Sequence, residues 1–160
     1  MSNSAITVPA SVDAWQTADW QRLWLSIRGP KRQWRSLALV PAGAGPSSDA
    51  IVQIALALAR TGMVHVGVPI HVADATKVTL AQLEPFREGL EWHMRDGEIM
   101  LLALPALSEN VTSLPLAKGA DKALLCVVLG EMLATEAKRT VTQIGATHFI
   151  GSSVFHPAAR

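Results

Sequence analysis

The chain has 160 residues, a formal net charge of +1 and an apolar fraction of 49%. So small a charge gives no bulk attraction to nucleic acid or to an anionic membrane, and we expect neither as a partner. The one cysteine, Cys126, excludes an internal disulfide, and its apolar neighbours predict a buried thiol. No apolar stretch is long enough to span a membrane, and residues 1–12 do not resemble a secretory signal. We therefore expect a cytoplasmic protein with no direct membrane span.

Hydrophobic spacing predicts helices that alternate with strands. We expect a flexible N-terminus at residues 1–11 and a single domain at residues 12–160. Continuous apolar strands joined by helices imply an α/β fold: a doubly wound, mostly parallel sheet of about five strands with helices on both faces. Up to residue 72 we expect a helix at 12–27, a strand at 36–40, a helix at 50–60 closed by Gly62, and a strand at 64–72 that ends near Val68 because of Pro69. After residue 72 we expect a helix at 79–95 divided by Pro85, a strand at 98–104, a loop with a helical turn at 105–119, a strand at 123–129, a helix at 131–144 and a strand at 147–154.

The loop at residues 41–49 follows the first long strand, and ligands of such sheets bind beyond the carboxyl ends of strands. A phosphate-binding P-loop needs glycines around the phosphates, a lysine against their charge and a hydroxyl for magnesium. This loop contains no lysine, and Pro46 lacks an N–H that could point at phosphate. We therefore interpret it as a vestigial phosphate loop, whose remaining candidates are Gly43, Gly45, Ser47 and Ser48.

Five segments carry a resemblance to a known family. They are residues 13–24 (DAWQTADWQRLW), the strand, loop and helix at 36–62, residues 98–106 (EIMLLALPA), residues 120–130 (ADKALLCVVLG) and the closing residues 149–151. In this order, over about residues 13–155, the chain resembles the cytoplasmic ATPase domain of bacterial tyrosine kinases, the chain-length regulators of exopolysaccharide synthesis. That family belongs to the ParA/MinD-type group of P-loop ATPases, so the resemblance implies a P-loop NTPase-like fold.

The departures from the family pattern concern its charged residues. In the loop, the resemblance places Ser47 where the family has the P-loop lysine and keeps Ser48 as the magnesium-ligating hydroxyl. In the strands, it places Pro69 and His71 at the two aspartates of the second family strand, and Ala103 at the Walker B aspartate. The chain also contains no tyrosine, so it has no site for tyrosine autophosphorylation. Phosphoryl transfer depends on such electrostatic groups. We therefore expect a pseudoenzyme without cofactor or metal.

The resemblance implies a role through protein–protein interaction in exopolysaccharide biosynthesis or export. The expected partner is a membrane chain-length protein, an active homologue or a second copy of the chain. Two alternatives remain open: a positioning scaffold of the ParA/MinD type, and a small enzyme with a remodelled site in the loop at 43–49. A metal site is not expected, because His65 and His71 on one predicted strand lie about 20 Å apart.

Tryptophans are concentrated near the N-terminus. Trp15, Trp20 and Trp24 recur in the first predicted helix. Their rings can pack on the sheet of this chain, or they can face a partner, because exposed tryptophan is frequent in binding hot spots. We name these three residues as a possible partner interface.

Overall fold

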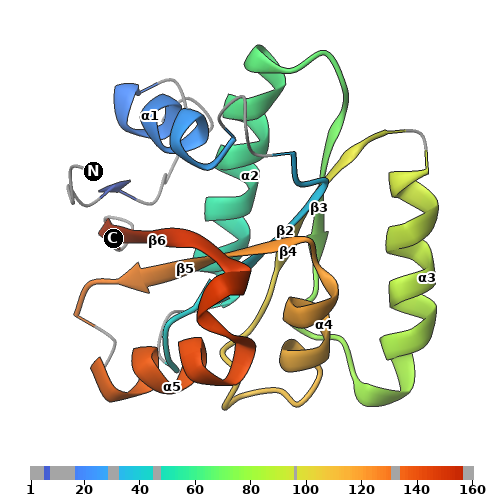
Figure 1. Cartoon of the computed structure of the whole chain (residues 1–160), viewed down its shortest axis with the longest axis vertical. Helices are drawn as coiled ribbons and strands as arrows, with labels where there is room; N and C mark the ends of the chain where they lie inside the picture. The colour runs from blue at the N-terminus through green and yellow to red at the C-terminus, as the bar shows by residue number, and fades with distance from the viewer. Residues whose placement is uncertain are drawn as a thin grey trace.

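The computed structural model describes residues 6–7, 17–28, 33–44, 48–95, 97–130 and 134–156. These residues form a six-stranded, entirely parallel sheet with strand order β1-β6-β5-β2-β4-β3 (Figure 1). The predicted α/β fold is therefore confirmed. The strands are β1 (Ile6–Thr7), β2 (Ser36–Pro41), β3 (Ile70–Asp74), β4 (Ile99–Ala103), β5 (Lys122–Val128) and β6 (Phe149–His156), and the α-helices are α1 (Ala18–Ile27), α2 (Ser48–His65), α3 (Leu83–Met94), α4 (Ser113–Gly119) and α5 (Ala134–Ile144).

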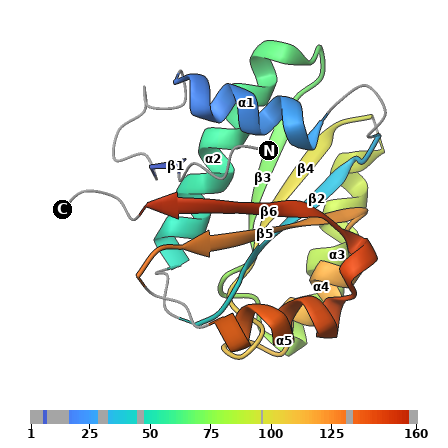
Figure 2. The ribbon, with the colours of Figure 1, turned by 60° about the vertical axis from the view of Figure 1, so that its left-hand side comes forward.

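Helices cover both faces of the sheet, as predicted. Successive side chains of β2 point to opposite faces, so Leu37 and Leu39 join one apolar core while Ala38 and Val40 join the other. The first core packs against α1 and α2, and the second packs against α3, α4 and α5 (Figures 1 and 2). β2 is completely buried because it lies in the middle of the sheet under helices on both sides.

The start of β2 is fixed by a polar contact with the start of β5. The Asp121 carboxylate accepts hydrogen bonds from the backbone N–H of Arg35 at 2.8 Å and of Ser36 at 3.2 Å. In return, the Asp121 N–H donates to the Ser36 hydroxyl at 2.8 Å. These bonds satisfy backbone donors just before the ladder begins, and they set the register of the two central strands.

The helix after the glycine loop is longer than predicted. α2 continues to His65 and passes through Gly62, which we expected to end it. A Cβ at Gly62 would lie 2.5 Å from Ile70 Cδ1 and 2.6 Å from Trp24 Cη2. The glycine therefore serves close packing of α2 against α1 and β3, and not the termination of the helix.

The predicted strand at 64–72 is wrong in its position. Its first residues belong to α2, and the strand itself is β3, Ile70–Asp74. The alternation of valines misled the assignment, because Val64 and Val68 are exposed and line no buried face. Pro69 consequently precedes β3, where a missing N–H breaks no ladder hydrogen bond.

Smaller differences follow from position within an element. Pro85 does not divide the helix that contains it, because it lies in the first turn of α3, where the N–H has no helical acceptor. Ile6 and Thr7, expected within the flexible N-terminus, instead pair in parallel with Phe155 and His156 of β6.

Among the described residues, no helix combines the length and the apolar character needed to cross a bilayer.

Candidate functional site

The loop interpreted above as a phosphate loop begins directly at the carboxyl end of the central strand. β2 ends at Pro41, and the next residue, Ala42, donates its N–H to the carbonyl of Cys126 at 2.9 Å. Ala42 and Gly43 are buried. Gly45 and Ser47 lie outside the described residues; Ser48 is the first residue of α2, but its side chain is likewise outside that description. Only Gly43, of the four loop candidates, can therefore be placed in atomic detail.

A small cavity of about 250 Å³ opens beside Gly43. Pockets for small molecules and cofactors commonly enclose about 300–1,000 Å³, so this cavity is below that range. It lies where α5 faces the loops that follow β2 and β4. The residues that line it are Gly43, Ala106, Leu107, Ser108, Glu136, Arg139, Thr140 and Gln143.

A carboxylate packs directly against the glycine of this loop. A Cβ built on Gly43 would overlap Glu136 Oε2 and would lie 3.0 Å from the Cβ of Glu136. The helix that carries Glu136 is tied to the same loop, because the Thr140 hydroxyl donates to the Ala42 carbonyl at 3.1 Å and to the Glu136 carbonyl at 2.9 Å. A negatively charged side chain thus packs against the backbone of Gly43.

One cation also reaches this cavity. Arg139 is one turn removed from Glu136 on α5 and lines the same walls. Within the described part of the chain it forms no ion pair. The cavity walls therefore carry one formal positive and one formal negative charge, with the negative charge against the glycine.

The strand ends at which the resemblance implies aspartates need one correction. β4 does end at Ala103, the residue that the resemblance places at the Walker B aspartate. The strand that follows α2 is β3, however, and it ends at Asp74 and not near Pro69. An aspartate is therefore present at a strand end beside Ala103, its ladder partner. Its Oδ1 accepts hydrogen bonds from the Thr76 N–H at 2.9 Å and from the Thr76 hydroxyl at 2.5 Å, which closes the turn after β3.

The proposed tryptophan interface is wrong for the two tryptophans that the structure describes. Trp20 and Trp24 are each only 1% exposed. Trp20 packs against Phe155 with ring centroids 5.8 Å apart, and Trp24 meets Trp34 edge to face at 6.0 Å. They pack α1 onto its own sheet and offer no surface to a partner, while Trp15 lies outside the described residues.

Cys126 is a core residue, as predicted. It lies fully buried in β5, next to Pro41 in the ladder with β2. Burial raises the pKa of its thiol from 9.0 to about 12, against a smaller opposing effect of its backbone hydrogen bond at Val40. At neutral pH the thiol is therefore protonated and is a poor nucleophile.

Sequence reasoning missed a group of side chains at the opposite end of the sheet. His71 on β3 meets His93 of α3 and Glu98, which directly precedes β4. Hydrophobic alternation predicts His71 and His65 on one strand, too far apart to share a metal, but His65 is an exposed residue of α2. The alternation of side chains along two paired strands could have found the group. His71 is the ladder partner of Met100, and Glu98 lies two residues before Met100 and therefore on the same face of the sheet.

Comparison with known proteins gives no assignment for this chain: no protein-family model matches it, and no curated protein shows a significant match.

Proposed function

We propose that this chain is a non-catalytic, kinase-like protein that acts by protein–protein contact in bacterial exopolysaccharide biosynthesis or export. The observation that supports the non-catalytic part is the Glu136 carboxylate, which packs against Gly43 in the loop that the sequence resemblance matches to a phosphate loop. The exopolysaccharide context is implied by the sequence resemblance alone.

Electrostatics favour this proposal. Two unit charges 4 Å apart interact by about 4 kcal/mol at an effective dielectric constant of 20, and by less where water screens them. A phosphate beside Gly43 would meet this repulsion from Glu136, and Arg139 could offset only one charge of a polyphosphate. Asp74 can offer a carboxylate to magnesium. This carboxylate is, however, a second negative charge at the same edge of the sheet, so it does not attract a triphosphate.

Calorimetric titration of the full chain with ATP and Mg²⁺ tests the non-catalytic part. We expect no saturable heat at millimolar nucleotide, in the wild type and in a folded Asp74→Asn variant alike. Micromolar binding that Asp74→Asn weakens would contradict the proposal and would favour the ParA/MinD-type alternative.

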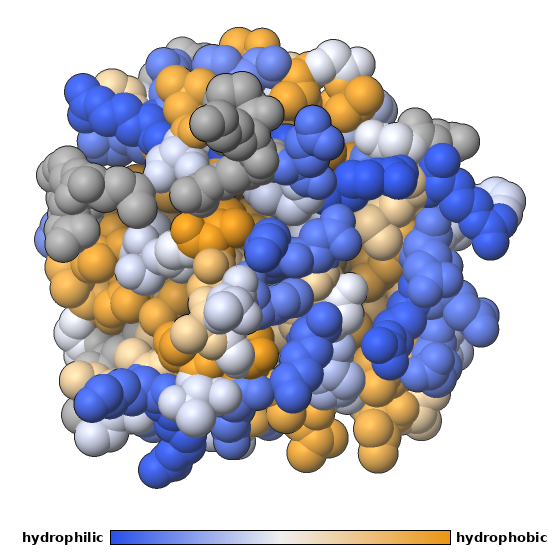
Figure 3. Space-filling view, viewed as in Figure 1, coloured by the Kyte–Doolittle hydropathy of each residue, from blue (hydrophilic) through white to orange (hydrophobic). Residues whose placement is uncertain are grey.

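Two exposed apolar side chains next to this edge supply a candidate contact surface. Leu80 is 68% exposed and Val111 is 73% exposed. Their loops are joined, because the carbonyl of Val78 accepts hydrogen bonds from the Asn110 amide and from the Thr112 hydroxyl, each at 3.0 Å. Figure 3 shows apolar side chains protruding along the lower edge of the molecule, below α3 and α4. Contiguous exposed apolar patches with a polar rim are typical of protein contact sites, and Leu80 and Val111 are candidate members of such a patch.

The contact surface is tested by copurification with the membrane chain-length protein of the same organism. We expect Leu80→Asp and Val111→Asp to abolish copurification while the far-ultraviolet circular dichroism stays unchanged. Leu25→Asp is the matched control, since Leu25 is 57% exposed but lies on α1, which packs against the other face of the sheet. Equal loss in all three variants, or in none, would refute this surface.

A further inference from the structure

Three side chains with metal-binding atoms converge at the amino end of the sheet, from three different elements. His71 is the second residue of β3, Glu98 immediately precedes β4, and His93 lies in the last turn of α3. His71 pairs with Met100, whose side chain belongs to the core under α3. Because side chains alternate along a strand, Glu98 shares that face, and α3 brings His93 to it.

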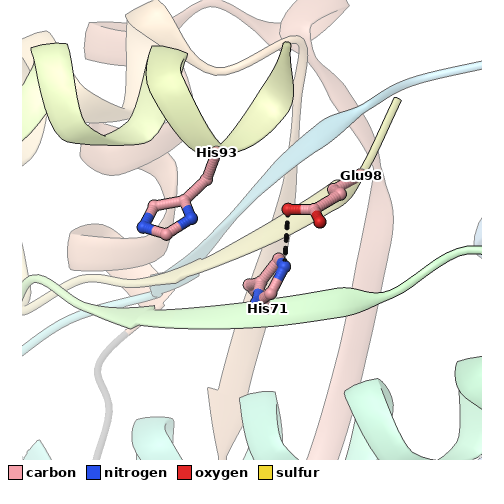
Figure 4. A group of neighbouring side chains, drawn as sticks. All are labelled: His71, His93 and Glu98. Atoms are coloured by element: carbon pink, nitrogen blue, oxygen red, sulfur yellow. Dashed lines mark hydrogen bonds and ion pairs between the residues drawn. The ribbon is translucent and has the colours of Figure 1, made fainter. Parts of the chain in front are cut away.

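The geometry of the group is compact. His71 Nε2 lies 2.7 Å from Glu98 Oε2, and the rings of His71 and His93 have centroids 5.4 Å apart. One ligand atom from each of the three residues lies within 4.8 Å of the other two. Figure 4 shows His93 descending from α3 on the side of the sheet where His71 and Glu98 face each other.

We propose that His71, His93 and Glu98 form a binding site for a divalent transition-metal ion of the Zn²⁺ type. Imidazole nitrogen and carboxylate oxygen are the donors that Zn²⁺ takes at about 2.0–2.2 Å, and tetrahedral bonds of that length separate ligand atoms by about 3.4 Å. The His71–Glu98 separation of 2.7 Å is shorter than that value, and all three donor atoms lie within 4.8 Å of one another, so rotation of the side chains has to adjust the donors to one ion. Three protein ligands leave a fourth position for water.

A simple ion pair between His71 and Glu98 does not account for the third residue. That pair is complete without His93, whose ring nevertheless lies beside it although His93 is exposed and free to turn to solvent. His71 and Glu98 retain side-chain exposures of 39% and 23%, so an ion can enter from water without opening the core. The site lies at the end of the sheet opposite the glycine loop, and its proposal does not rest on the proposed function.

Titration of the untagged full chain with Zn²⁺ against a chromogenic chelator, and with Co²⁺ followed by visible absorption, tests the site. We expect one ion per chain and a Co²⁺ spectrum typical of low coordination number. His93→Ala is the ligand variant, because an exposed residue can be removed without unfolding the chain. His65→Ala is the matched control, because His65 is also exposed but lies outside the group.

The expected result is that His93→Ala and Glu98→Gln each weaken Zn²⁺ binding at least tenfold, whereas His65→Ala changes it less than twofold. Absence of stoichiometric binding by the wild type would overturn the proposal. So would a His93→Ala variant of unchanged affinity, or an equal loss in His65→Ala, because the ion would then bind elsewhere.

Discussion

The two ends of the parallel sheet differ in the functional side chains that lie at them. At the carboxyl end, a segment that contains Gly43 joins β2 to α2, and a carboxylate packs on this glycine. At the amino end, His71, His93 and Glu98 bring a chemically coherent set of donors together from three elements. We interpret the first end as a former phosphate loop without its charged residues, and we propose the second as a metal site whose ligands are dispersed in the sequence.

The difference follows from how each end is built. The carboxyl-end loop is continuous in sequence, so its missing lysine can be read directly from the chain. The amino-end group joins residues from three elements, and only the register of β3 against β4 and the path of α3 place them together. Loss of a contiguous motif is therefore visible in a sequence, whereas gain of a dispersed site is not.

The largest effect on stability should come from a substitution in the apolar core, which supports both ends of the sheet. Trp24→Ala removes a fully buried ring that packs on Trp34 and next to Gly62, and it should lower the free energy of unfolding by about 3–5 kcal/mol. Chemical denaturation followed by circular dichroism measures this loss. Trp92→Ala is the control, since Trp92 is 66% exposed and its removal should change stability by about 0.5 kcal/mol or less. Equal effects of the two substitutions would contradict the core assignment of Trp24.

A second substitution addresses the carboxyl end alone. Gly43→Ala should cost about 1–3 kcal/mol, because the new methyl group overlaps Glu136 and the packed surroundings resist the shift. Glu136→Ala in the same chain should recover most of that loss, and a double-mutant cycle in denaturant measures the coupling. Additive effects would mean that Glu136 does not pack on the loop.

Most of the fold could be predicted from the sequence, but its exact boundaries could not. Apolar runs such as the one around Leu37 identified the buried strands, because a strand covered on both faces shows continuous hydrophobicity. Valine alternation after Gly62 imitated a strand, although the helix continues to His65. Because of that error, the strand was predicted to end near Pro69, whereas β3 ends at Asp74. The acidic residue at this strand end was therefore missed.

The sites were less predictable, because they depend on packing. The contact between Gly43 and Glu136 joins residues far apart in the chain, and no spacing rule links them. The same holds for His71 and His93. Periodicity placed Trp20 and Trp24 on a helix, but burial by Phe155 and Trp34, and not the pattern, decides that they face the sheet.

A third prediction uses Cys126, which lies under the carboxyl-end loop, to test whether that end opens by itself. Its folded pKa of about 12 exceeds the unfolded value of 9.0, so the neutral thiol favours the folded state and the contribution is lost as pH rises above 9. At pH 10 the unfolded thiol is mostly ionised and the folded one is not, which lowers stability by about 1.4 kcal/mol. Cys126→Ala should remove this part of the pH dependence, as measured by denaturation at pH 8 and pH 10.

The same thiol can be followed by alkylation in the native protein at neutral pH. If the loop after β2 is held by Ala42 and Thr140 as described, the thiol should react only at the rate of global unfolding. Fast alkylation without loss of circular dichroism would show that the carboxyl end opens locally, and the two ends would then differ in rigidity as well as in chemistry.

The smallest effect should be found at the amino end in metal-free protein. Glu98→Gln removes the charge from a pair that is partly open to water, and such pairs contribute about 0–1 kcal/mol. Denaturation in the presence of a chelator should therefore show almost no change. With Zn²⁺ present the wild type should gain stability that Glu98→Gln does not, because only an ion that binds the folded state adds to its stability. A large loss without metal would identify Glu98 as a residue that also stabilises the fold at the amino end of the sheet.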